Sequence, residues 1–143
     1  LALHKAQEVA QTCAPEDIVI AADTIVYLNG VILGKPKDTA DAARMLAALS
    51  GREHTVYTGV AVLRGGEMRL AAEHTAVRFR TLTPAEIARY IATGEPMDKA
   101  GAYGIQGRGA LFVAHLDGDY FNVMGLPLCR LGQLLNELGV ELL

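Results

Sequence analysis

The chain has 143 residues, and at roughly 100–200 residues per domain this length predicts one domain spanning residues 1–143. Hydrophobic residues make up 51% of the sequence and charged residues 20%, which excludes disordered and collagen-like chains. The net charge of -3, without a Lys/Arg cluster, argues against a nucleic-acid partner. No apolar run approaches the ~20 residues of a membrane span, so we expect a cytoplasmic protein without a membrane partner.

Several catalytic chemistries are also excluded by single residue types. Ser50 is the only serine, and no G-x-S-x-G elbow surrounds it, so a serine hydrolase is excluded. Cys13 and Cys129 are far apart and predict two buried thiols rather than a disulfide framework. The histidines are scattered singly, without the spacing of a zinc site. Any metal should therefore be a hard cation held by oxygen atoms.

The first predicted elements are a helix and a buried strand. Residues 1–12 place apolar side chains on one helical face. The apolar run at 18–22 is typical of a strand that is buried on both faces of a sheet. We expect Asp23 and Thr24 to lie where that strand ends, which is a usual place for ligand-binding residues in open α/β sheets.

A hairpin and a second helix follow. Asn29-Gly30 is a strong two-residue hairpin signal, and it separates apolar runs at 25–28 and 31–33. Asp38 or Thr39 can cap a helix that runs to about residue 49, with Gly51 in the stop position.

The middle of the chain predicts a long hairpin and a third helix. Alternating residues at 54–64 and 68–80 flank a Gly65-Gly66 turn. Thr83-Pro84-Ala85-Glu86 is a capping box with proline at the first helical position, and Gly94 ends the helix that it begins.

The last third begins with a glycine-rich loop over 95–109, where the backbone can approach its neighbours closely. The segments 111–116 and 120–123 then predict a hairpin around Asp117-Gly118. Leu126-Pro127 begins a final helix that Gly139 ends. This order of helices and strands predicts an α/β fold with a mixed sheet.

Residue chemistry alone indicates an acid-and-lysine set. Asp23 is a carboxylate next to a buried strand, although a simple strand-end turn explains it too. Lys35, between Gly34 and Pro36, can meet phosphate as a point charge or can be a surface lysine. The glycine-rich loop adds Asp98, Lys99 and Gln106, together with Glu95, and a solvated loop explains most of that equally well.

Five blocks of the sequence, in this order, resemble the Maf family of nucleoside triphosphate pyrophosphatases. They are Ala22-Asp23-Thr24, Gly34-Lys35-Pro36, Ser50-Gly51 with His54-Thr55-Val56 and Thr58-Gly59, Asp98 to Gly107, and Asn122-Val123 with Gly125-Leu126-Pro127. The resemblance covers essentially the whole chain, and the block from Asp98 to Gly107 is similar to the branch that acts on dTTP and UTP. It implies a sheet bent around a central cleft, as in the related inosine triphosphatase architecture, and a homodimer.

The resemblance also implies a reaction and roles for individual residues. The reaction is hydrolysis of a nucleoside triphosphate to the monophosphate and pyrophosphate, with Mg²⁺ or Mn²⁺ as cofactor. Asp23 corresponds to the family's acidic residue, either as proton acceptor for the attacking water or as a metal ligand. The implied substrate-binding residues are two that are associated with substrate choice and three cations: Thr24, Gln106, Lys5, Lys35 and Lys99.

One departure from the family pattern concerns phosphate binding. The family opens with a strand and a Ser-x-x-Ser-Pro-Arg-Arg loop, and no Ser-Pro-Arg-Arg occurs in this sequence. The expectation is therefore a single Maf-like domain over 1–143 that lacks the family's first strand and phosphate-binding loop. The resemblance leaves one alternative function, a nucleotide-binding regulator of septum formation or cell division without significant turnover.

Overall fold

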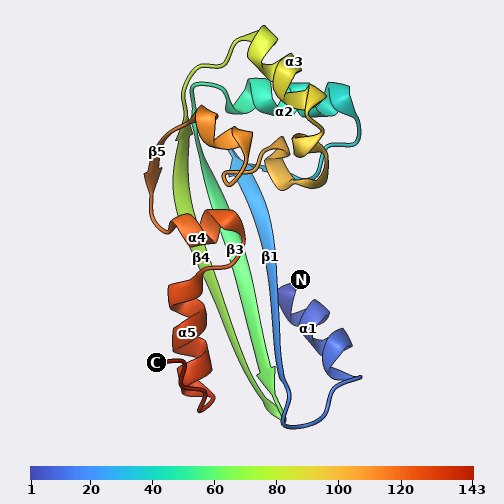
Figure 1. The fold of residues 1–143 in the computed structure, drawn as a ribbon, viewed down its shortest axis with the longest axis vertical. Helices are drawn as coiled ribbons and strands as arrows, with labels where there is room; N and C mark the ends of the chain where they lie inside the picture. The colour runs from blue at the N-terminus through green and yellow to red at the C-terminus, as the bar shows by residue number, and fades with distance from the viewer.

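A five-stranded sheet runs along the molecule, with strand order β2-β1-β3-β4-β5 (Figure 1). In this computed structural model, which describes residues 1–143, three long strands form the centre: β1 (Ile18–Leu28), β3 (Glu53–Arg64) and β4 (Glu67–Phe79). The short strands β2 (Val31–Leu33) and β5 (Val113–Asp117) lie at the edges. Helices pack against this sheet, so the predicted α/β class is confirmed.

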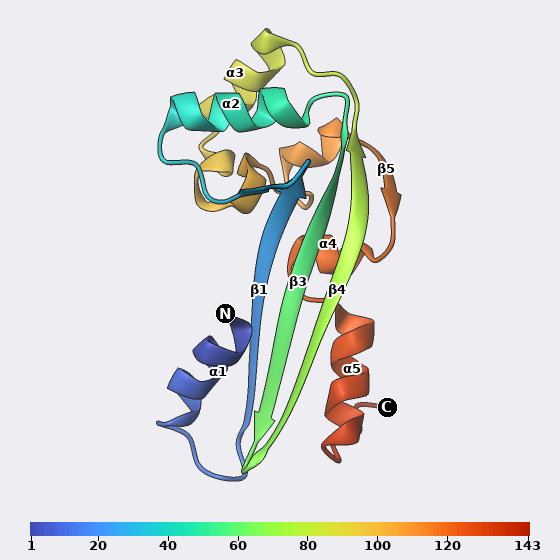
Figure 2. The same ribbon diagram turned by 180° about the vertical axis from the view of Figure 1, so that it is seen from behind.

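All four strand pairings are antiparallel, whereas the sequence predicted a mixed sheet. A parallel pair needs a crossover that returns the chain to the end where the previous strand began. Here the connections do not return. β2 and α2 (Thr39–Leu49) stay at the end where β1 finishes, and α3 (Pro84–Ala92) stays where β4 finishes (Figure 2).

The two ends of the sheet are covered differently. At one end, α2, α3 and the 3-10 helices η1 (Glu95–Asp98), η2 (Ala100–Ala102) and η3 (Arg108–Phe112) surround a core of 17 buried residues. We call this end the head. At the other end, α1 (Ala2–Ala10) packs on one sheet face and α5 (Leu128–Glu137) on the other, over buried clusters of four and six residues. We call this end the tail.

Local sequence signals explain where the helices of the head begin. The Asp38 carboxylate accepts a 2.7 Å hydrogen bond from the Asp41 amide and caps α2. Thr83 and Glu86 form the predicted capping box, with Pro84 in the first turn of α3. The predicted Asn29-Gly30 hairpin joins β1 to β2, and Gly30 adopts the positive φ of 84° that this turn requires.

The hairpin predicted around Asp117-Gly118 is wrong. Tyr120–Met124 forms the short helix α4, and β5 pairs with β4 instead. The reason is a cap and an anchor: the Asp119 carboxylate accepts the Phe121 amide at 2.8 Å, and the buried Asn122 amide donates to Val56 O at 3.1 Å. A helical turn satisfies both contacts.

Two further expectations are corrected by the structure. Asp23 and Thr24 lie within β1 rather than at its end, because the strand continues to Leu28 through its pairing with β3. Cys129 is exposed and Cys13 is half-buried, so the prediction of two buried thiols is wrong. No helix of the chain is both long and apolar enough to cross a bilayer.

Ser50, the only serine, has a structural role at the end of α2. Its Oγ accepts a 2.7 Å hydrogen bond from the Leu82 amide and so ties α2 to the segment that leads into α3.

Candidate active site

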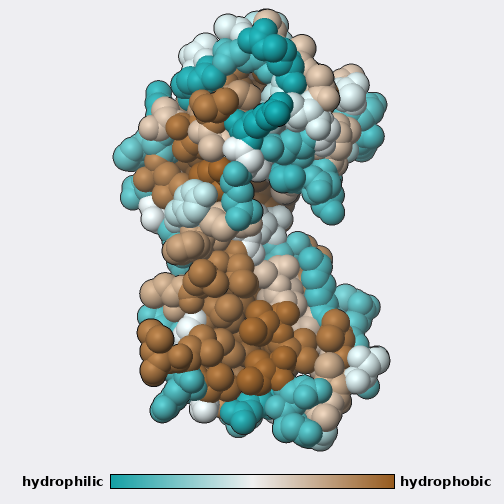
Figure 3. Space-filling model, in the orientation of Figure 1, coloured by the Kyte–Doolittle hydropathy of each residue, from teal (hydrophilic) through white to brown (hydrophobic).

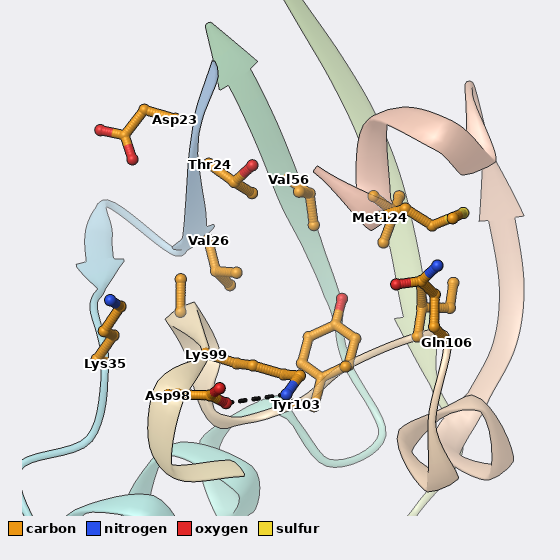
Figure 4. A pocket seen from close by; sticks show the side chains of 14 residues that line it. Asp23, Thr24, Val26, Lys35, Val56, Asp98, Lys99, Tyr103, Gln106 and Met124 are labelled. Atoms are coloured by element: carbon orange, nitrogen blue, oxygen red, sulfur yellow. Dashed lines mark hydrogen bonds and ion pairs between the residues drawn. The ribbon is translucent and has the colours of Figure 1, made fainter. Parts of the chain in front are cut away.

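A cavity of about 280 Å³ lies where the head meets the middle of β1 (Figure 4). Its walls come from β1, β3, the loop after β2, the segment from η1 to Gln106, and α4. Five of the six predicted site residues line it: Asp23, Thr24, Lys35, Lys99 and Gln106. The sixth, Lys5, reaches the cavity through Asp23. The structure therefore brings together predicted site residues as far apart in the sequence as Asp23 and Gln106.

Asp23 is held by a lysine from α1. Lys5 Nζ lies 3.3 Å from Asp23 Oδ1 and 3.5 Å from the Ala22 carbonyl oxygen. The Asp23 side chain stays 28% exposed, so its carboxylate remains accessible to water and to ligands. The opposing residue on β3 is Gly59, which places no side chain beside the carboxylate. Lys5 thus orients Asp23 without covering it.

Thr24 belongs to a hydrogen-bonded chain that fixes the direction of its proton. The Thr24 and Thr58 hydroxyl oxygens are 3.0 Å apart, and Thr58 donates its only hydroxyl proton to the Asn122 carbonyl oxygen at 2.9 Å. Thr58 can therefore only accept from Thr24, so Thr24 donates. The Thr24 oxygen is left with lone pairs for a ligand in the cavity.

Two lysines and an aspartate occupy the wall that the head contributes. Lys99 Nζ donates to Asp98 Oδ1 at 2.9 Å and to the Glu95 carbonyl oxygen at 3.2 Å. The hydrogen bond and charge of Lys99 lower the pKa of Asp98, and the charge of Lys35 contributes. Lys35 stands on the loop after β2, which is tied to η2 by a 3.1 Å bond from the Gly101 amide to Gly34 O. Together with Lys5 and Asp23, the site holds three cations and two carboxylates.

Tyr103 lines the cavity and is paired behind it with the buried His54. The buried Tyr103 hydroxyl lies 2.6 Å from His54 Nε2, and burial lowers the pKa of His54 to about 4. Burial also raises the pKa of Tyr103. Val26 and Val56 add apolar surface. Figure 4 shows Gln106 and Met124 on the side away from Asp23, Lys35 and Asp98. The cavity thus has a charged end and an end with an amide and apolar groups.

The carboxylates permit only one mode of metal binding. No group of three or more His, Cys, Asp or Glu side chains forms a cage for a metal ion. Mg²⁺ commonly needs just one or two carboxylates when the phosphates of a substrate supply further ligands. Asp23, which is partly exposed and lines the cavity, fits this mode.

Comparisons with known proteins agree with the geometry. The family model described as Maf-like protein matches residues 1–138. The chain belongs to the Maf family. Over 143 residues it is 58% identical to a dTTP/UTP pyrophosphatase of Moorella thermoacetica, with 99% of this chain and 73% of the relative covered. The proteins of the same name from Symbiobacterium thermophilum and Clostridium novyi are 55% and 52% identical; 97% and 99% of this chain and 71% and 75% of those relatives are covered.

Sequence reasoning missed some residues of the Maf site. Thr58 and Tyr103 touch predicted site residues or the cavity directly, yet no role was assigned to either. Both residues stand in blocks that carry the family resemblance, Thr58-Gly59 and Asp98 to Gly107, and those blocks were the available signal. Asp98 was noted as a member of the acid-and-lysine set of the glycine-rich loop, without a role of its own. Its contact with Lys99 joins two adjacent residues, which a sequence pattern could have indicated.

Proposed function

We propose that this Maf protein hydrolyses nucleoside triphosphates, dTTP and UTP in particular, to the monophosphate and pyrophosphate. The observation that carries the proposal is the single cavity in which Asp23, Lys35, Lys99 and Gln106 converge. Relatives more than 50% identical that bear the name dTTP/UTP pyrophosphatase support the reaction and the substrates.

The charged end of the cavity suits the triphosphate. Lys35 and Lys99 act as point charges that attract phosphate oxygens, and Lys5 adds a third ammonium group beside Asp23. The reaction needs no protein nucleophile, because water opens the anhydride in one displacement. This agrees with the structural role of Ser50.

Asp23 takes the proton in this proposal. A water molecule on the open side of the carboxylate attacks the α-phosphorus, and its proton passes to Asp23 as the new oxygen–phosphorus bond forms. The bond from that phosphorus to the bridging oxygen breaks, and pyrophosphate leaves with the electron pair. Lys5, at 3.3 Å, keeps the carboxylate in place during the transfer.

We also propose a Mg²⁺ or Mn²⁺ cofactor, and holding it is the alternative role for Asp23. Such a cation would neutralise phosphate charge and polarise the phosphorus. Lys35 and Lys99 supply the rest of the positive charge from the chain itself.

Gln106 and Thr24 suit the base. The Gln106 amide offers both a donor and an acceptor, which match the adjacent polar groups of thymine or uracil. Thr24 presents an acceptor, since its proton is engaged by Thr58. A site that hydrogen-bonds one base edge discriminates against other bases, whose polar groups would be left unpaired.

The proposal is tested by measuring pyrophosphate release across the common nucleoside triphosphates with Mn²⁺. The chain is assayed alone and with a Ser-Pro-Arg-Arg segment of the family fused ahead of Leu1. We expect release from dTTP and UTP above all others, and faster release from the fused protein. Nucleotide binding without release in either form would favour the regulator of cell division instead.

A homodimer remains a proposal of its own. Between Ile18 and Ile25 the outer edge of β1 has no partner strand, because β2 pairs only with Val26–Leu28. Ile18 and Ile20 are also about 40% exposed there. Unpaired edges with apolar side chains favour association between chains.

The cytoplasmic location expected from the sequence remains a prediction.

A further inference from the structure

Gln106 stands in a tight turn of four residues. The Gly107 amide donates to the Gly104 carbonyl oxygen at 3.3 Å, so Gln106 is the third residue of the turn. Its side chain is exposed, while the preceding Ile105 is buried in the core of the head. The direction of the Gln106 amide therefore depends on how firmly the two ends of this turn are held.

Two residues outside the cavity hold those ends. The Tyr90 hydroxyl accepts the Gly104 amide at 3.1 Å, before the turn. The Glu95 carboxylate accepts the Arg108 amide at 3.0 Å and the Gly109 amide at 3.1 Å, after the turn. Tyr90 also donates its proton to Glu95, which joins the two supports. Neither Tyr90 nor Glu95 lines the cavity.

The glycines of this segment confirm how closely the supports approach the backbone. A Cβ at Gly109 would lie 2.5 Å from the Gly104 carbonyl oxygen and 2.9 Å from the Tyr90 hydroxyl oxygen. A Cβ at Gly107 would overlap the Glu95 carboxylate. Only glycine allows the main chain to pack directly on both supporting side chains.

The protonation states suit these hydrogen bonds. Burial alone would raise the pKa of Glu95, but the bonds from Tyr90, Arg108 and Gly109 outweigh it and lower that pKa. Burial and the bond to Glu95 raise the pKa of Tyr90. Near neutral pH, Tyr90 is therefore a neutral donor and Glu95 a charged acceptor, and hydrogen bonds to a charged group are the stronger kind.

Glu95 also reaches the phosphate end of the site. Its carbonyl oxygen accepts a 3.2 Å bond from Lys99 Nζ. One residue thus supports the Gln106 turn through its side chain and a lysine of the charged wall through its backbone. A change confined to the side chain should affect the turn and spare the lysine.

We propose that Tyr90 and Glu95 are positioning residues that determine base selection by holding the Gln106 turn. The proposal rests on the proposed function, because it assumes that Gln106 reads the base. Loss of either support allows the turn to shift, and the amide then no longer matches thymine or uracil. A displacement of about 1 Å is enough to spoil such a match, so selectivity should fall before the chemical step does.

The test uses Glu95→Gln and Tyr90→Phe, each made in the chain of 143 residues. For each variant, kcat and KM are measured with dTTP and with dGTP. We expect the ratio of kcat/KM for dTTP to that for dGTP to fall about tenfold, through KM for dTTP, with kcat changed less than about threefold. If the two residues had only a structural role, the variants would melt at a lower temperature and would lose kcat/KM for both nucleotides by the same factor.

Matched controls carry the same chemical changes elsewhere. Glu86→Gln, on α3, removes a carboxylate charge that pairs with Arg80, and Tyr57→Phe removes a hydroxyl from β3. Both controls should keep the dTTP-to-dGTP ratio of the unchanged protein. Ratios in Glu95→Gln and Tyr90→Phe equal to those of the controls would overturn the proposal.

A second measurement separates this proposal from the proposed function. Binding of dTMP and dGMP is measured by calorimetry in the same variants, without turnover. If the unchanged protein releases no pyrophosphate, the proposed function fails. A loss of dTMP preference in the two variants would still support the positioning role. Unchanged preference in both variants would reject it.

Discussion

The head and the tail of this Maf protein differ in the size of the hydrophobic cores that they bury. The head encloses a core of 17 buried residues, whereas the two clusters of the tail contain six and four. In the tail one helix covers each sheet face, and Ile18, Ile20, Met68 and Leu70 stay 40–52% exposed. Figure 3 shows the resulting apolar surface over the lower half of the molecule.

The site draws different components from the two halves. Lys35, Lys99 and Gln106 come from the head, whereas α1 of the tail brings Lys5 to Asp23 on β1. The residue proposed to read the base therefore stands on an exposed turn of the head, whose ends are held by Tyr90 and Glu95. The proton acceptor needs only an orienting lysine and access to water. The predictions below test this division of roles.

The largest effect should follow from Asp23→Asn, which keeps the shape of the side chain and removes the proton acceptor. We expect turnover to fall by about 10²–10⁴-fold, the usual effect of losing a general base, with the fold retained. Steady-state kinetics and circular dichroism check both parts. The control is Asp17→Asn, the same chemical change in the loop before β1 and outside the cavity, and it should leave turnover unchanged. Retention of more than half the turnover by Asp23→Asn would remove Asp23 from the mechanism.

Because the two halves differ in packing, the same leucine-to-alanine change should destabilise the head more than the tail. Leu46, fully buried in the head, and Leu134, 5% exposed in the tail, are each replaced by alanine. We expect Leu46→Ala to lower the free energy of unfolding by about 4–5 kcal/mol and Leu134→Ala by about 2–3 kcal/mol, because the thinner tail can relax around the cavity. Urea denaturation measures both. Equal costs would show that the halves are packed alike.

The head should also be the more sensitive half to acid, through His54. The unfolded state binds a proton near pH 6.5, whereas the folded state binds it only near pH 4 because His54 is buried. The stabilisation is therefore complete above pH 6.5 and is lost as the pH falls toward 4, on the order of 3 kcal/mol. Unfolding free energies between pH 4 and 7.5 should fall less steeply for His54→Gln. Parallel curves for the two proteins would contradict this role of His54.

The smallest effect on stability should come from the exposed surface of the tail. Ile20→Lys places a charge on the face beside the free edge of β1, where the isoleucine is 43% exposed. We expect a change in unfolding free energy within about 0.5 kcal/mol, and weaker self-association in sizing chromatography. The control is Val31→Lys on the short edge strand β2. If Ile20→Lys associates as strongly as the unchanged protein, this surface is not an interface between chains.

Local signals in the sequence predicted the fold well where the structure is locally determined. The Asn29-Gly30 hairpin and the Thr83–Glu86 capping box were confirmed, because each depends on contacts within four residues. The segment 120–123 was wrongly predicted as a strand, since it belongs to the helix α4. Its helix depends on Asn122 reaching Val56, 66 positions away, and no local pattern reports such a contact.

The candidate site was predicted in composition more than in geometry. The motifs named six residues, of which five line the cavity, but the 3.3 Å contact of the sixth, Lys5, with Asp23 depends on α1 packing against β1. The support of the Gln106 turn by Tyr90 and Glu95 was equally hidden. It depends on how the chain folds back between α3 and η3, which the glycine spacing did not reveal.

The division of roles between the halves is tested most directly by comparing Asp23→Asn with Gln106→Ala side by side. For each protein, kcat/KM is measured with dTTP and dGTP. We predict that Asp23→Asn lowers both values by the same factor and preserves their ratio. Gln106→Ala should lower the ratio about tenfold or more, with a smaller loss in kcat. An equal loss of kcat/KM for both nucleotides in Gln106→Ala, or an altered ratio in Asp23→Asn, would contradict this division of roles.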